Sequence, residues 1–205
     1  MDWELPFRGL ATGLIIAAPV GPVNVLCIQR TIEKGWKSGV FSGLGSAVAD
    51  TVYGACAAFG ISLVIDFLIR EEFWIRLVGG MLLMGIGVVY YCKAPRPLGK
   101  ETGSAHSDFA STFLLTATNP TTVLSFLAVL AMLGLGKQRP MWETSFLVGG
   151  IFCGSMAWWV ILASGVNLLR GKVTDRTTRW MNRVAGIAIG GFGLVNVVLS
   201  WWHRD

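Results

Sequence analysis

Long apolar stretches separated by short polar segments run along almost the whole chain. A helix needs roughly 20 mainly apolar residues to cross the hydrocarbon core of a bilayer, and six stretches meet that length. The pattern predicts an all-α membrane protein with six transmembrane helices. The expected spans are residues 5–29, 38–65, 73–92, 109–135, 142–169 and 181–202.

The composition agrees with this pattern. Hydrophobic residues make up 53% of the chain and charged residues only 14%, whereas a soluble domain needs more charged surface to cover its core. The first stretch begins with Asp2 and Glu4 and contains prolines, so we expect a retained helix and not a cleaved signal peptide.

The net charge of +5 follows the predicted topology and does not indicate nucleic-acid binding. Most basic residues fall in the first, third and fifth loops, which the positive-inside rule places in the cytoplasm. Both termini are therefore expected outside. The basic residues of those three loops are Arg30, Lys34, Lys37, Lys93, Arg96, Lys100, Arg170, Lys172, Arg176, Arg179 and Arg183.

The second half of the chain repeats the first. We expect one three-helix repeat over residues 1–93, a cytoplasmic linker over 94–108 and a second repeat over 109–205. Because each unit has an odd number of spans, the two copies cross the membrane in opposite senses, as in many secondary transporters. At an offset of 106 residues, Trp74, Val78, Gly80, Gly85, Gly87 and Val89 match Trp180, Val184, Gly186, Gly191, Gly193 and Val195.

Prolines break the first and fourth predicted helices at matching places. Pro19, Gly21 and Pro22 lie within the first stretch, and Asn119-Pro120 lies within the fourth. A proline removes a helical hydrogen bond, and the freed groups are tolerated in a membrane only when they are buried in protein or line a wet cavity.

The half-helices that follow these breaks offer free N–H groups and positive dipole ends, which suit a carboxylate. The polar residues beside these ends either cap the broken backbone or contact a solute. They are Asn24, Asn119, Thr121 and Thr122.

Asp50 is the one formal charge between Gly39 and Ile65. A charge at mid-bilayer costs roughly 2.5 to 3.5 kcal/mol, so such a residue is usually kept where it faces a wet cavity. Asp50 can bind a substrate amine, couple transport to protons, or do both in turn. The alternative is a structural carboxylate satisfied by the hydroxyl of Thr51 or Ser46.

The residue equivalent to Asp50 in the second repeat is Ser155, so the predicted site is asymmetric. Tyr53 and Trp158 are also equivalent, and we expect them to pack in the core or to wall the cavity. Glycine pairs at four-residue spacing, such as Gly9 and Gly13, predict close helix packing, and such a face is compatible with a homodimer.

Three segments resemble the LysE/RhtB superfamily of bacterial amino-acid exporters: Gly21 to Arg30, Gly43 to Gly54, and Thr116 to Thr122. Gly149 to Trp159 adds to the match. The resemblance implies a six-helix exporter in the bacterial inner membrane, energised by the proton gradient, which carries small amino acids or related metabolites. The expected partners are this solute, protons and the bilayer.

Two other functions are open. A divalent-metal exporter, as in cadmium-exporting relatives, needs several oxygen or sulfur ligands, and the chain offers one buried carboxylate plus the thiols of Cys27, Cys56 and Cys153. A transmembrane thiol carrier needs two thiols that meet, but the equivalent of Cys27 is Ser125. We therefore predict a transporter without enzyme activity, cofactor or resident metal.

Overall fold

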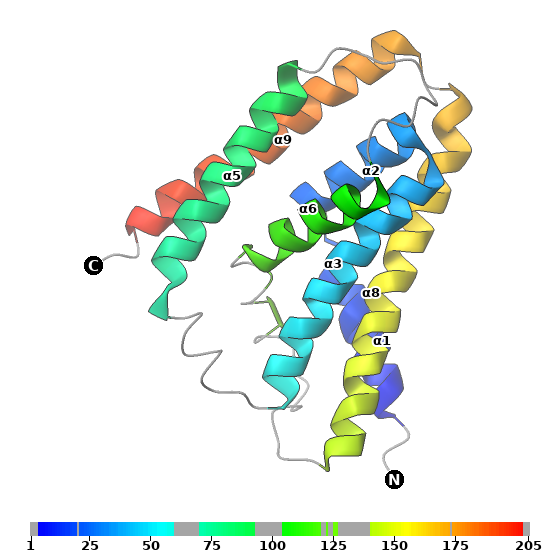
Figure 1. The fold of residues 1–205 in the computed structure, drawn as a ribbon, viewed down its shortest axis with the longest axis vertical. Coiled ribbons are helices and arrows are strands. Elements are labelled where there is room, and N and C mark those ends of the chain that lie inside the picture. The colour runs from blue at the N-terminus through cyan, green and yellow to red at the C-terminus, as the bar shows by residue number, and fades with distance from the viewer. Residues whose placement is uncertain are drawn as a thin grey trace.

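The computed structural model describes residues 4–19, 21–59, 70–92, 104–119, 122, 125–126, 140–172 and 174–202, and all regular structure in them is helical. Figure 1 shows the arrangement. The α-helices are α1 (Leu5–Ala17), α2 (Pro22–Lys34), α3 (Trp36–Ala58), α5 (Glu72–Cys92), α6 (Ala105–Ala117), α8 (Met141–Leu169) and α9 (Asp175–Trp202), with the 3₁₀ turn η1 (Arg170–Lys172) after α8.

Three of these helices contain segments long and apolar enough to cross a membrane: Phe73–Cys92, Met141–Leu169 and Arg176–Trp201. The pair α1 and α2 meets the same test only when the two helices are taken together, bent by 82° at the break, as a broken span or a re-entrant loop. The described residues thus confirm an all-helical fold with apolar helices of membrane-spanning length. The other two predicted spans, 38–65 and 109–135, run into residues outside the described ranges, so six spans and the inverted repeat stay predictions.

The first predicted helix is broken where its prolines lie. Gly21 has extended backbone angles at the N-cap of α2, and Pro22 occupies the first turn of α2, where a missing N–H costs nothing. The helix then runs to Lys34, beyond the predicted end at residue 29. It ends at Gly35, whose φ of 102° is a conformation that favours glycine.

α6 begins at Ala105, four residues before the predicted span. Ser104 is its N-cap, and its hydroxyl accepts a 3.3 Å hydrogen bond from the Ser107 N–H. The last residues of the predicted linker, including Asp108, therefore lie inside a helix.

α1 packs against α8, α6 packs against α3, and α5 packs against α9. Glycines allow the close approaches: a Cβ at Gly9 or Gly150 would overlap the facing helix of the α1–α8 pair, and a Cβ at Gly45 would overlap α6. In the α5–α9 pair, Gly80 faces Gly193 and Gly87 faces Gly186. The repeat makes Gly80 equivalent to Gly186 and Gly87 equivalent to Gly193, so it exchanges the two contacts.

The turn from α2 into α3 and the turn from α8 into α9 lie at one end of the molecule, at the top of Figure 1, far from the N-terminus. Arg170 joins them, because its Nε donates a 2.8 Å hydrogen bond to the carbonyl of Ile32. These are the first and fifth loops, which the charge pattern predicts on the same side.

Candidate functional site

A cavity of about 160 Å³ lies beside the break between α1 and α2. Its described lining also includes residues of α3, the end of α6, α8 and α9. Seven of the ten predicted site residues line it: Pro19, Gly21, Pro22, Asn24, Asp50, Asn119 and Thr122. Ser155 is not in the lining but hydrogen-bonds to Asp50, which is. Pro120 and Thr121 lie outside the described residues.

Asp50 is buried, with 3% of its surface exposed. Its Oδ2 accepts a 2.7 Å hydrogen bond from the Ser155 hydroxyl, which in turn accepts a 3.2 Å bond from Trp159 Nε1. Within the described part of the chain, no Lys or Arg forms an ion pair with Asp50 and no donor binds its Oδ1. One carboxylate oxygen is therefore held by α8, and the other has no donor among the described residues.

The structural partners considered for Asp50 bind elsewhere. The Thr51 hydroxyl donates a 2.6 Å bond to the carbonyl of Ala47, and the Ser46 hydroxyl accepts a 3.0 Å bond from Thr116. Neither satisfies Asp50.

Asn24 caps the first break. Its Nδ2 donates to the carbonyls of Pro19 at 2.9 Å and Ala17 at 3.4 Å, and its Oδ1 accepts a 3.0 Å bond from Trp158 Nε1. The side chain thus satisfies backbone groups that the prolines set free, which is the capping role expected of asparagine at such a break. It shapes the cavity, and its polar atoms are already engaged.

The start of α2 supplies hydrogen-bond donors to the cavity. The first N–H groups of a helix have no intrahelical acceptor, Pro22 has no N–H, and Gly21 has no side chain to cap the others. The amides of Val23 and Asn24 therefore remain at the positive end of the helix, and both residues line the cavity. The cavity lining thus combines the positive end of α2 with a carboxylate of α3.

Tyr53 and Trp158 brace the two breaks and are not part of the described cavity lining. The Tyr53 hydroxyl donates a hydrogen bond to the carbonyl of Ala117, at the end of α6, while Trp158 holds Asn24 at the first break. Each residue therefore supports the break of the other predicted repeat.

A polar seam that the sequence analysis missed joins α3 to α6. On α3, Ser38, Ser42, Ser46 and Asp50 recur every four residues, so they lie on one helix face, and all four are buried. Asp108, Thr112 and Thr116 recur in the same way on α6 and are also buried. The four-residue spacing of polar side chains in both apolar stretches is the signal that could have revealed this seam.

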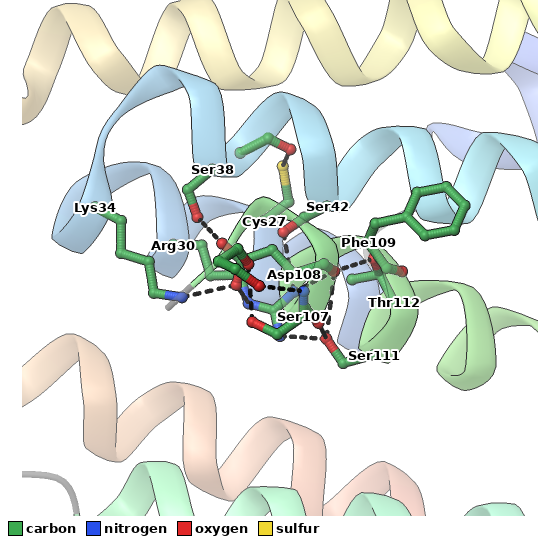
Figure 2. A network of polar contacts seen from close by, with 12 residues as sticks. Cys27, Arg30, Lys34, Ser38, Ser42, Ser107, Asp108, Phe109, Ser111 and Thr112 are labelled. Carbon is green, nitrogen blue, oxygen red and sulfur yellow. Dashed lines mark hydrogen bonds and ion pairs between the residues drawn. The ribbon is translucent and has the colours of Figure 1, made fainter. Parts of the chain in front are cut away.

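One end of the seam is a charged cluster of Arg30, Lys34, Asp108, Ser38 and Ser42, shown in Figure 2. Asp108 accepts a 2.6 Å hydrogen bond from the Ser38 hydroxyl and forms a 2.7 Å ion pair with Lys34. Arg30 lies 3.4 Å from the same carboxylate and donates 2.9 Å bonds to the Ser42 hydroxyl and the Asp108 carbonyl. The cluster ties α2, α3 and α6 together.

Arg30 was expected in a cytoplasmic loop, but the structure places it within α2 with only 9% exposed. The positive-inside count treats all basic residues near a span end alike and cannot recognise one that finds a buried partner on a distant helix. Asp108 was missed because it is the last residue of the predicted linker, where a carboxylate resembles an ordinary loop charge.

The thiols give no support to a metal site in the described part of the chain. The Cys27 thiol donates a 3.4 Å bond to the carbonyl of Gly39, and no cysteine belongs to the described lining of the cavity. Among the residues that the structure describes, no group of three His, Cys, Asp or Glu side chains could hold a metal ion.

Comparison with known proteins places this chain among membrane translocators. The family model described as LysE type translocator matches residues 14–200. The chain is 28% identical over 192 residues to "Putative amino acid efflux protein YcgF" of Bacillus subtilis (strain 168), covering 90% of each chain. It is 27% identical over 196 residues to the uncharacterized membrane protein YahN of Escherichia coli (strain K12), covering 90% of this chain and 86% of that one. No solved structure matches the chain.

Proposed function

The chain belongs to the LysE type translocator family, and from this premise we propose that it exports amino acids or similar small metabolites across the bacterial inner membrane in exchange for protons. The observation that carries the proposal is the cavity in which Asp50 meets the donor end of α2. The name of the Bacillus subtilis relative, an amino acid efflux protein, supports the same solute class.

The cavity suits a small zwitterion. The carboxylate of the zwitterion would accept hydrogen bonds from the backbone N–H groups of Val23 and Asn24. Its ammonium group would bind Oδ1 of Asp50. The cavity, at about 160 Å³, is small for a peptide, which favours a solute of the size of a small amino acid.

Asp50 would couple the solute to protons by binding only one of them at a time. An ammonium group beside the buried carboxylate favours its charged form, whereas an empty, dehydrated site favours the neutral form. Release of the amine would therefore be accompanied by uptake of a proton. The Ser155 hydroxyl serves both states, because it can donate to the carboxylate and accept from the acid.

The charged cluster would close one access route to the cavity. Ser42 and Asp50 are eight residues apart on α3, so the cluster lies about 12 Å from the cavity along the helix. Opening this route requires α6 to separate from α3 and the ion pairs of Asp108 to break. The contacts that the predicted repeat exchanges, Gly80 with Gly193 and Gly186 with Gly87, support the pseudo-two-fold relation between halves that inverted-repeat transporters use for alternating access.

Transport by the full chain in lipid vesicles tests this proposal. Vesicles are loaded with a mixture of labelled amino acids, and efflux is measured with and without an imposed pH gradient. We expect gradient-dependent efflux that Asp50→Asn abolishes. Glu4→Gln is the matched control, because Glu4 is an exposed carboxylate whose pair with Arg8 contributes little.

Two results would contradict the proposal. One is efflux by Asp50→Asn at the rate of the unaltered protein. The other is export of cadmium without export of any amino acid, which would favour the metal-exporting relatives instead.

A further inference from the structure

Three arginines and a tryptophan share one face at the start of α9. Arg176, Arg179, Trp180 and Arg183 are spaced by three or four residues, so their side chains lie next to one another on the helix. All four are exposed, Trp180 by 67%. Together with Thr177 they line a surface hollow of about 690 Å³.

The opposite face of the same turns is buried against the rest of the protein. Thr178 and Asn182 are buried, and Gln29 of α2 donates hydrogen bonds to the Met181 carbonyl at 3.3 Å and to Asn182 Oδ1 at 3.4 Å. These contacts fix the rotation of α9. The arginine face therefore points away from the helices that it packs against.

Along α9, the arginine face continues into an exposed apolar stripe. Val184, Ile187 and Val195 are 43%, 64% and 53% exposed and follow Trp180 at helical spacing. In a transmembrane helix an exposed apolar stripe faces lipid tails, and a tryptophan at its end marks the interface. In a bilayer this order of side chains would place the arginines at the level of the lipid headgroups, next to the tails.

The charge of this cluster is not neutralised by the side chains that the structure describes, since none of them forms an ion pair or hydrogen bond with Arg176, Arg179 or Arg183. The first turns of a helix are also its positive end, so these arginines do not stabilise α9 by themselves. The planar fork of arginine matches the oxygens of a phosphate.

We propose that Arg176, Arg179 and Arg183 bind the phosphate headgroup of an anionic phospholipid, with its acyl chains lying along Val184 and Ile187. The lipid is favoured over a soluble phosphate ester because the apolar stripe begins where the cationic cluster ends. Basic pockets of this kind at the cytoplasmic ends of helices are suited to acidic headgroups.

Binding of phosphatidylglycerol to the purified full chain tests this assignment. The protein in neutral detergent is titrated with phosphatidylglycerol or phosphatidylcholine, and bound lipid is counted by native mass spectrometry while the melting temperature is followed. We expect specific retention of phosphatidylglycerol and a higher melting temperature. Replacing all three arginines by glutamine should weaken that binding by on the order of tenfold to a hundredfold.

The matched control removes three exposed basic residues elsewhere, with Arg8→Gln, Lys37→Gln and Arg70→Gln, and should bind phosphatidylglycerol as the unaltered chain does. The triple lysine variant keeps the charge but loses the fork, and should bind with intermediate strength. Equal loss of binding in the control, or no preference over phosphatidylcholine in the unaltered chain, would overturn the proposal. Equal stabilisation by inorganic phosphate would overturn the choice of a lipid.

Discussion

The Ser155 hydroxyl donates a 2.7 Å hydrogen bond to Oδ2 of Asp50, and these residues occupy equivalent positions in the predicted repeat. Equivalent residues can touch only close to the axis that relates the two halves. The bond therefore supports a pseudo-two-fold axis beside the cavity. It also makes the site chemically asymmetric at that point, with an acid on one side and a hydroxyl on the other.

Ser155→Ala should slow amino-acid efflux by about tenfold to a hundredfold without abolishing it. The variant removes a hydrogen bond to a charged group, which is worth about 1.5 to 3 kcal/mol, but leaves the carboxylate able to bind an ammonium group. Efflux from loaded vesicles measures the effect. The control is Ser145→Ala, since Ser145 is exposed and its hydroxyl donates only to the Met141 carbonyl of its own helix. Equal rates for the two variants would show that the bond to Asp50 is not used.

Asn24→Ala should destabilise the protein by about 1 to 3 kcal/mol, because it removes the donor to the Pro19 carbonyl and leaves Trp158 Nε1 without its acceptor. Trp158→Phe should cost less, about 1 kcal/mol for one hydrogen bond, because Asn24 still caps the break. Thermal unfolding in detergent measures both, and the double variant should cost less than the two single losses combined. Strict additivity would mean that Trp158 does not brace the first break.

The cavity could be predicted from the sequence because the residues that form it stand out along the chain without knowledge of the packing. Prolines such as Pro22 and a lone charge such as Asp50 are conspicuous inside apolar runs, and the repeat predicts matching depths for the breaks at Pro22 and Pro120. The charged cluster is different, since Arg30 and Asp108 are 78 residues apart and each lies near a predicted span end. Only their packing distinguishes them from ordinary loop charges.

The same limit applies to the aromatic residues. Tyr53 and Trp158 could be paired from the repeat, but their roles depend on which carbonyl or amide lies within reach of the hydroxyl or the indole N–H. Such contacts follow from the crossing of α3 over α6 and of α8 over the break. Residue spacing along one helix does not determine how two helices cross.

Gly150→Ala should be strongly destabilising and Gly149→Ala should be neutral or slightly stabilising. A Cβ at Gly150 would overlap the Pro6 carbonyl of α1 and lie 3.0 Å from Leu10 N, whereas a Cβ at Gly149 meets nothing within 4 Å. Overpacking costs about 1 to 3 kcal/mol, and alanine is favoured over glycine in a helix by up to about 1 kcal/mol. Thermal unfolding of the two neighbouring variants compares them directly, and similar melting temperatures would contradict the close α1–α8 packing.

Asp108→Asn should weaken the charged cluster and expose the polar seam. The buried Arg30 would lose its carboxylate, and breaking a buried ion pair by removing one partner costs about 3 to 5 kcal/mol. If the cluster closes a route to the cavity, a cysteine introduced as Ser46→Cys should react faster with a water-soluble thiol reagent in the Asp108→Asn background. Lys34→Gln should have a smaller effect, because Lys34 is more exposed than Arg30 and Arg30 still pairs with Asp108.

The control for this experiment must separate opening of the route from general loosening. The control cysteine is Ser164→Cys. Ser164 lies on α8, where its hydroxyl accepts a hydrogen bond from Trp36 at an exposed position, so the reaction rate of a cysteine there should not change with Asp108→Asn. Faster labelling at both cysteines would indicate partial unfolding. Unchanged labelling at Ser46→Cys, in a variant whose melting temperature has fallen, would mean that the cluster holds α2, α3 and α6 together without controlling access to Asp50.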